Sequence, residues 1–143
     1  MPVNRNPYSQ YANNKIMGAS PAELTLMLYE GTIKFCNQAK LAIESRNVEK
    51  AHNSIVRAEQ IIAYLQDTLD MKYPVAKDFN NVYNYLLLRL RDANLQKNSD
   101  ILDEVLTHIR TMRDTWKKVM AQTAGKSRQQ LASELMEQQG QDG

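Results

Sequence analysis

Cysteine, glycine and proline are all scarce in this chain of 143 residues. The single cysteine, Cys36, excludes an internal disulfide and fits a reducing compartment. A catalytic thiol would need a histidine nearby, and the chain has only His52 and His108. Cys36 is therefore expected to be a small buried side chain on the first helix. With five glycines and four prolines, the chain also has few of the residues that favour tight turns.

An excess of charge of one sign is missing as well, since 18 basic and 16 acidic residues leave a net charge of +2. Such a balance provides no strong field for nucleic acid or for an anionic membrane surface. The N-terminus has no apolar core of a signal peptide, and no apolar run approaches the length of a membrane span. We therefore expect a cytoplasmic protein.

Apolar residues recur at intervals of three and four, the spacing that places side chains on one face of a helix. The clearest sets are Val48, Ala51, Ile55, Ala58, Ile62, Leu65 and Leu69, followed by Leu102, Val105, Ile109, Met112, Trp116 and Val119. Further helices are expected over about 20–45 and 75–95. Because the connections are short, neighbouring helices should be antiparallel. The sequence thus predicts an all-α fold, an antiparallel up-down four-helix bundle.

The first helix has a well-marked start. Ser20 is a good N-cap, Pro21 suits the first helical position, and Glu23 can complete a capping box. Its expected core seam consists of Leu24, Leu28, Phe35, Ala39 and Ala42, and a second set of Leu26, Tyr29, Ile33 and Cys36 broadens the apolar face.

The two ends of the chain differ from its middle. Residues 1–19 show no sustained period and are interpreted as a flexible N-terminal segment, and residues 20–121 as the bundle. Residues 122–143 form a Gln-rich tail, partly helical or disordered, in which a short helix over Ser127–Met136 is possible.

No catalytic, metal or cofactor site is expected. Glu49 and His52 match the Glu-x-x-His spacing of di-iron bundles, but that chemistry needs two such pairs and two further carboxylates. A phosphotransfer or signalling bundle is the alternative function, with His52 or His108 as the acceptor. Neither histidine is followed by the close Lys-Gly of the familiar phosphotransfer motif. We therefore expect that the chain is not an enzyme.

The apolar faces are wider than the three positions in seven that a bundle helix needs for its core. One interpretation is a thick core, and the other is a hydrophobic groove that accepts the amphipathic helices of another chain. From helical phase, the candidate groove residues are Leu26, Tyr29, Ile33, Ile61, Tyr64, Tyr83 and Leu87. A third possibility is a structural bundle that self-associates through this face.

Three apolar residues stand out in the polar N-terminal segment, namely Tyr8, Tyr11 and Ile16. They could fold back onto the groove and be displaced by the partner, or they could dock a second partner themselves. Tyrosine suits either role because its ring buries apolar area while its hydroxyl stays in water.

The chain resembles the FliS family of flagellar secretion chaperones, the export chaperones for flagellin. The resemblance covers roughly Asn6 to Lys118. It rests on the order and spacing of Asn6-Pro7-Tyr8, Tyr11, Ala19 to Gly31, Ile33-Lys34-Phe35, Ala42-Ile43-Glu44, Ala58 to Ile62, Tyr83-Asn84-Tyr85-Leu86, Arg89, Leu90, Ala93-Asn94, Glu104-Val105 and Asp114 to Lys117.

This resemblance implies an antiparallel helical bundle without catalytic activity. It implies that the chain binds the C-terminal segment of newly made flagellin one to one and hides the surface through which flagellin polymerises. It further implies delivery of the complex to the cytoplasmic domain of the export-gate membrane protein of the type III apparatus. In the family the N-terminal segment can occupy part of the flagellin site or contact the gate, and the corresponding positions here are Tyr8 and Tyr11.

Overall fold

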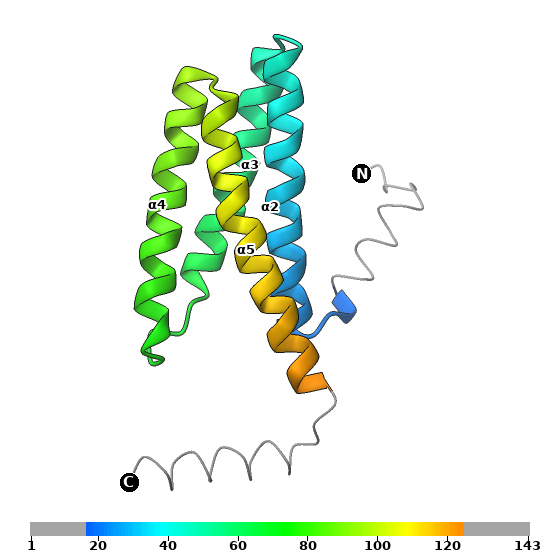
Figure 1. Ribbon diagram of the computed structural model, residues 1–143, viewed down its shortest axis with the longest axis vertical. Helices are drawn as coiled ribbons and strands as arrows, with labels where there is room; N and C mark the ends of the chain where they lie inside the picture. The colour runs from blue at the N-terminus through cyan, green and yellow to red at the C-terminus, as the bar shows by residue number, and fades with distance from the viewer. Residues whose placement is uncertain (1–16, 125–143) are drawn as a thin grey trace, which may run out of the picture.

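The computed structural model describes residues 17–124. In this part of the chain four helices run up and down in turn: α2 (Pro21–Glu44), α3 (Val48–Asp67), α4 (Val75–Gln96) and α5 (Ser99–Ala124) (Figure 1). Helix α2 packs against α3 and α5, and α4 packs against the same two helices, so the four form a closed ring. The predicted all-α bundle is confirmed. Two other predictions fall outside the described residues: the roles of Tyr8, Tyr11 and Ile16, and the tail helix over Ser127–Met136.

The predicted capping box at the start of α2 is present. The backbone N–H of Glu23 donates to Ser20 Oγ at 3.1 Å, and the Ser20 N–H donates to the Glu23 carboxylate at 3.4 Å. Pro21 occupies the first turn, where a missing N–H costs nothing. These contacts fix where α2 begins and therefore set the phase of all the side chains that follow it.

Two tight connections are made without glycine. Arg46 (φ 59°) and Lys97 (φ 49°) adopt the left-handed conformation at the ends of α2 and α4. For a residue with a Cβ this conformation costs about 1–2 kcal/mol. At Lys97 the side-chain ammonium donates to the backbone and side-chain oxygens of Asn94, both at 2.6 Å, which helps to hold the turn. A chain with few glycines can therefore still fold into an up-down bundle.

The core lies along the axis of the ring and is built from one face of each helix. Its fully buried side chains include Ile55, Ile62, Leu86, Leu90, Leu102, Val105, Leu106 and Ile109. Helix α2 contributes mostly smaller residues to this core: besides Tyr29 they are Thr32, Cys36, Ala39 and Ala42. Burial of Cys36 agrees with the sequence-based expectation.

The seam predicted for α2 was only partly right. Ala39 and Ala42 are buried, but Leu24, Leu28 and Phe35 are only partly so, and Tyr29 and Cys36 face the core instead. The reason is Thr32, which occupies a fully buried position because its hydroxyl donates to the backbone oxygen of Leu28 at 3.0 Å. With its hydroxyl satisfied in this way, threonine can take a core position that a count of apolar residues leaves out.

Candidate partner-binding groove

An open apolar groove of about 460 Å³ runs between α2 and α3. It is lined by Leu24, Leu28, Phe35, Arg57, Gln60, Ile61 and Tyr64. The helices approach closely here: a Cβ on Gly31 would lie 3.3 Å from the end of the Ile61 side chain. Larger side chains beside this contact, those of Leu28, Phe35 and Ile61, are partly buried against the core and line the groove with their remaining surface.

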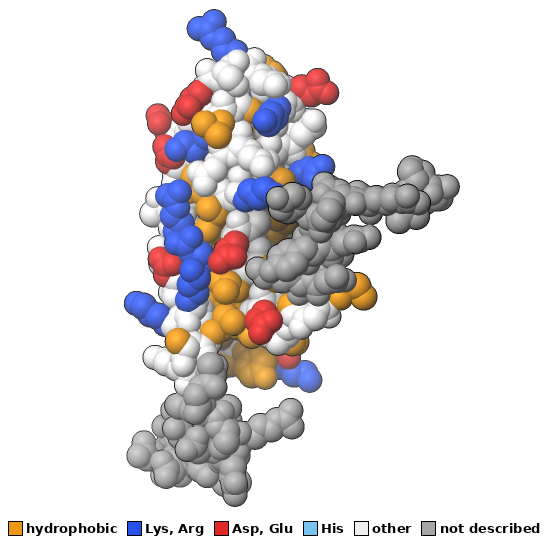
Figure 2. All heavy atoms as spheres, turned by 90° about the vertical axis from the view of Figure 1, so that its right-hand side faces the viewer, with side chains coloured by type: hydrophobic (Ala, Val, Ile, Leu, Met, Phe, Trp, Pro, Cys, Tyr) orange, Lys and Arg blue, Asp and Glu red, His pale blue; other side chains and the backbone are white. Residues whose placement is uncertain are grey.

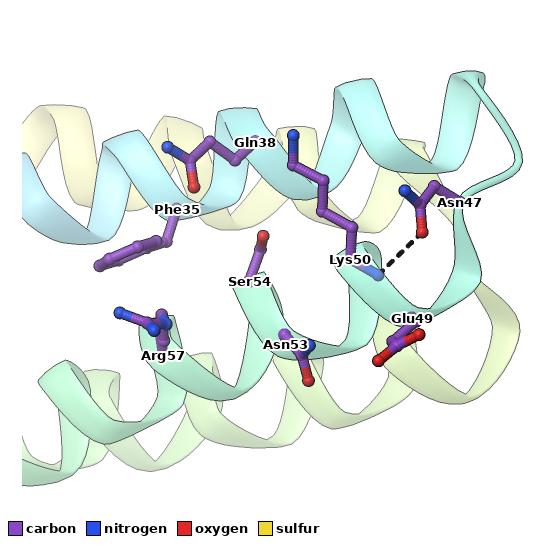
Figure 3. A pocket seen from close by; sticks show the side chains of 8 residues that line it. All are labelled: Phe35, Gln38, Asn47, Glu49, Lys50, Asn53, Ser54 and Arg57. Atoms are coloured by element: carbon purple, nitrogen blue, oxygen red, sulfur yellow. Dashed lines mark hydrogen bonds between the residues drawn. The ribbon is translucent and has the colours of Figure 1, made fainter.

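A polar depression of about 410 Å³ continues the groove toward the loop between α2 and α3. Gln38 of α2 and Asn47, Glu49, Lys50, Asn53 and Ser54 line it, together with Phe35 and Arg57, which it shares with the apolar part. In Figure 3 Lys50 extends from α3 toward α2, while Glu49 lies on the other side of α3. The groove thus changes from apolar to polar along its length.

Phe35 marks the junction between the two parts. The Lys34 ammonium and the Arg57 guanidinium each lie 5.6 Å from the centre of its ring. A cation at this distance from an aromatic face is attracted to the ring by about 0.5–1 kcal/mol at an exposed site. Figure 3 shows Phe35 and Arg57 pointing toward one another across the space between the helices.

The seven predicted groove residues do not lie on one surface. Ile61 and Tyr64 line the groove between α2 and α3, and Tyr64 is 49% exposed. Leu26, Ile33 and Leu87 are partly buried, and Ile33 and Leu87 pack against the core. None of these three lines the groove. Residues Leu24, Leu28, Phe35 and Arg57 line it in their place, and correct phasing of α2 would have pointed to the first three.

Tyr29 and Tyr83 are core residues rather than accessible anchors, which corrects their assignment to the groove surface. They are only 5% and 3% exposed, and their hydroxyls share a hydrogen bond of 2.9 Å between α2 and α4. Burial raises the pKa of both phenols, and at Tyr83 the hydrogen bond with Tyr29 raises it further. From the sequence alone, a tyrosine is expected near the surface with its hydroxyl in water. Here each hydroxyl has a hydrogen-bond partner, so burial of the two rings leaves no polar group unsatisfied.

The tyrosine pair also lines a cavity of about 160 Å³ at the end of the bundle where α2 begins. Trp116 of α5 lines the same cavity, and its indole N–H donates to the backbone oxygen of Ala22 at 2.9 Å. Trp116 was expected in the core, and it does pack against the core while remaining partly buried. The bond ties the C-terminal part of α5 to the first turn of α2.

The hydroxyl pair predicts a non-additive effect on stability. Tyr29→Phe or Tyr83→Phe alone should lower the free energy of unfolding by about 1 kcal/mol, because each leaves one buried hydroxyl without its partner. The double variant should cost little more than either single one. Urea denaturation measures all three, with Tyr85→Phe as a control at a surface hydroxyl that donates to Glu104. Additive losses in the double variant would contradict the pairing.

The two histidines occupy different surface positions. His52 Nδ1 lies 2.9 Å from the side-chain amide of Asn94, and the His108 ring meets the Tyr85 ring edge-on. Beside His108, Glu104 accepts from Tyr85 and from Arg89, and these hydrogen bonds lower the pKa of its carboxyl group. Within residues 17–124, no three His, Cys, Asp or Glu side chains gather as a metal site would require.

The exposed surface combines apolar, basic and acidic side chains. On the side of the molecule where α2 lies, Figure 2 shows hydrophobic side chains in patches along the bundle, with Lys, Arg, Asp and Glu side chains beside them. Among the described helices, none has the length and apolar content needed to span a bilayer.

The fold is an all-α bundle with an open apolar groove between α2 and α3. In comparison with known proteins, residues 4–123 match the family model described as flagellar protein FliS. The chain therefore belongs to the FliS family. As a member of it, the protein is a flagellar chaperone with a non-enzymatic role.

Several curated relatives share the match. The flagellar secretion chaperone FliS of Bacillus subtilis is 36% identical over 116 residues, which cover 81% of this chain and 87% of that protein. The protein of the same name from Campylobacter jejuni is 32% identical over 118 residues, covering 81% of this chain and 92% of that protein. The flagellar secretion chaperone FliS of Salmonella typhimurium is 28% identical over 116 residues, which cover 78% of this chain and 86% of that protein.

Proposed function

We propose that this chain is a cytoplasmic export chaperone that binds the C-terminal segment of flagellin in a one-to-one complex. By covering that segment it prevents premature polymerisation, and it then delivers flagellin to the cytoplasmic domain of the export-gate membrane protein. The observation that carries the proposal is the open apolar groove between α2 and α3, in a chain that belongs to a family of flagellar secretion chaperones.

The groove has the features that a helical client needs. An amphipathic helix docks by placing apolar residues at positions i, i+3, i+4 and i+7 into such a channel. Leu24 and Leu28 provide apolar contacts about one turn apart on α2, and Ile61 and Tyr64 do so on α3, so the groove is apolar on both sides. The half-exposed ring of Tyr64 has apolar area left to bury.

Energetics explain why several contacts are required. A client segment that orders on binding loses about 2–5 kcal/mol or more of the gross interaction energy. Burial of one Leu or Phe side chain contributes about 1.5–3 kcal/mol. Two or more anchors are therefore needed before binding becomes favourable. A long groove meets this requirement better than a single deep pocket does.

The N-terminal residues Tyr8, Tyr11 and Ile16 lie outside the described residues. Two roles remain as predictions for them: they cover the groove in the absence of client, or they contact the export gate. The helix that follows them begins beside the apolar part of the groove, since Leu24 lies in its first turns. A segment of this length therefore starts close enough to reach the groove.

Calorimetric titration of the purified chain tests the proposal. We expect one-to-one binding to full-length flagellin and no binding to flagellin that lacks its C-terminal segment. Light scattering of the free chain and of the complex establishes the stoichiometry and reveals any self-association through the apolar face. Equal binding to both forms of flagellin would move the contact away from the C-terminal segment, and binding to neither would remove the flagellin assignment.

A further inference from the structure

The groove between α2 and α3 carries positive charge at one end only. The apolar part, which ends at Phe35, has Arg57 as its one charged lining residue. The polar part adds Lys50 and a single acid, Glu49, and Figure 3 shows Lys50 and Arg57 on the side of α3 nearer to α2. A client that fills the whole groove therefore meets apolar side chains first and cationic side chains afterwards.

We propose that the client helix in this groove carries an acidic side chain that lies between Lys50 and Arg57, so that charge fixes which way the segment is oriented. The inference rests on the proposed function and adds the chemistry and direction of the client. Apolar burial has no direction of its own and would accept an amphipathic helix either way round. An acid at one end distinguishes the two orientations, because only one of them brings it to the cations.

The dimensions of the groove define where this acid should be. Phe35 lies eleven positions after Leu24, so the apolar part spans about 16 Å at about 1.5 Å per residue. Lys50 and Arg57 are seven positions apart on α3, which corresponds to about 10 Å. Because Arg57 lies beside Phe35 and Lys50 at the far end of this span, the client should place its acid about one helical turn beyond the anchor that contacts Phe35.

The arrangement around Phe35 supports an anion at this place. Arg57 rests against the Phe35 ring, and no ion pair between Arg57 or Lys50 and a described acid is present. A guanidinium oriented by an aromatic ring can bind a carboxylate with less loss of conformational freedom than an unconstrained side chain. Among the described residues, Lys40, Arg89 and Arg113 do form ion pairs with acids of this chain.

Binding of the flagellin C-terminal segment to charge-neutralised variants tests the inference. Arg57→Gln and Lys50→Gln should each weaken binding about two- to fivefold at low salt, the usual range for one exposed ion pair. Both variants should also flatten the dependence of affinity on salt, because screening acts on the charge that has been removed. Lys77→Gln, an exposed site on α4, is the matched control and should change neither quantity.

The acid itself is found by a double-mutant cycle. Each Asp or Glu of the flagellin segment is changed singly to its amide and titrated against the wild-type chain and against Arg57→Gln. For the acid that lies between Lys50 and Arg57, the two changes together should cost less binding free energy than the sum of their separate effects. Additivity at every acid would overturn the inference.

The possible failures are distinguishable. If wild-type protein binds the segment while Arg57→Gln and Lys50→Gln bind with unchanged affinity and salt dependence, the acidic contact is wrong and the proposed function stands. If Arg91→Gln, in the separate depression between α3 and α4, is the variant that weakens binding, the acid lies in that other groove and the inference is also wrong. Absence of binding to the wild type overturns both proposals.

Discussion

Above pH 9 the bundle is expected to lose stability steeply because of Cys36. The thiol is fully buried, and burial raises its pKa from 9.0 to about 12, an effect that the charge of Arg110 only partly offsets. A group with a raised folded-state pKa stabilises the fold below its unfolded-state pKa, and this contribution is lost as the pH rises toward the folded-state value. The free energy of unfolding should thus fall by about 1.4 kcal/mol per pH unit between pH 9 and 12.

Urea denaturation at pH 8 and pH 11 measures this loss, with Cys36→Ala as the matched variant. The wild type should lose about 3 kcal/mol more than Cys36→Ala between the two pH values. The variant has a lower starting stability because of the cavity that it creates, so the comparison is between changes with pH. It should still lose some stability, since the buried phenols of Tyr29 and Tyr83 also have raised pKa values. Equal losses in the two proteins would show that the thiol is not the cause.

The sequence predicted the arrangement of the helices well because three independent signals agree. Apolar spacing indicated four helical faces, the Ser20 capping box marked the start of α2, and the short connections imposed antiparallel neighbours. Each signal is local, so it can be read from the chain without knowledge of what packs where. The observed helices α2 and α4 begin within one residue of the expected positions, about 20 and about 75.

The site was predicted less well because side-chain exposure depends on contacts between helices. Tyr29 and Tyr83 are far apart in sequence, and nothing local indicates that their hydroxyls meet. Thr32 looks polar in sequence but is buried, which shifts the true core face of α2 away from Leu24 and Leu28. The core face assumed for α2 was therefore rotated slightly from the observed one. As a result, groove residues were predicted to lie in the core and core residues in the groove. Ile61 and Tyr64, on a helix with a regular apolar pattern, do line the groove, and their contact with a partner stays a prediction.

Whether a side chain lies in the core or in the groove also decides which substitutions are informative about binding. Ile33 and Leu87 were candidate groove residues, and a charge at either would test that assignment, but both side chains pack against the core. Such changes would lower stability and affinity together, and the two effects would be hard to separate. Tyr64 is the better choice because half of its surface is exposed and its hydroxyl bonds no described side chain.

Tyr64→Ala should weaken binding of the flagellin C-terminal segment by at least about thirtyfold, with the bundle intact. Buried aromatic anchors at the centre of an interface typically contribute 2 kcal/mol or more, and about 1.4 kcal/mol corresponds to a tenfold change in affinity. The free energy of unfolding should change by less than about 0.5 kcal/mol, because the ring is half-exposed and alanine is a good helix former. Titration calorimetry gives the affinity and urea denaturation the stability.

Tyr73→Ala is the matched control for this substitution. Tyr73 is 63% exposed in the connection between α3 and α4, it lines neither part of the groove, and it undergoes the same loss of an aromatic ring. The affinity of Tyr73→Ala for the flagellin C-terminal segment should stay within about twofold of the wild-type value, because surface substitutions away from an interface have small effects. Equal weakening by both variants would place the client on a wider surface than the groove. An unchanged affinity in Tyr64→Ala would remove the apolar part of the groove from the binding site, because Tyr64 is the largest exposed apolar side chain that lines it.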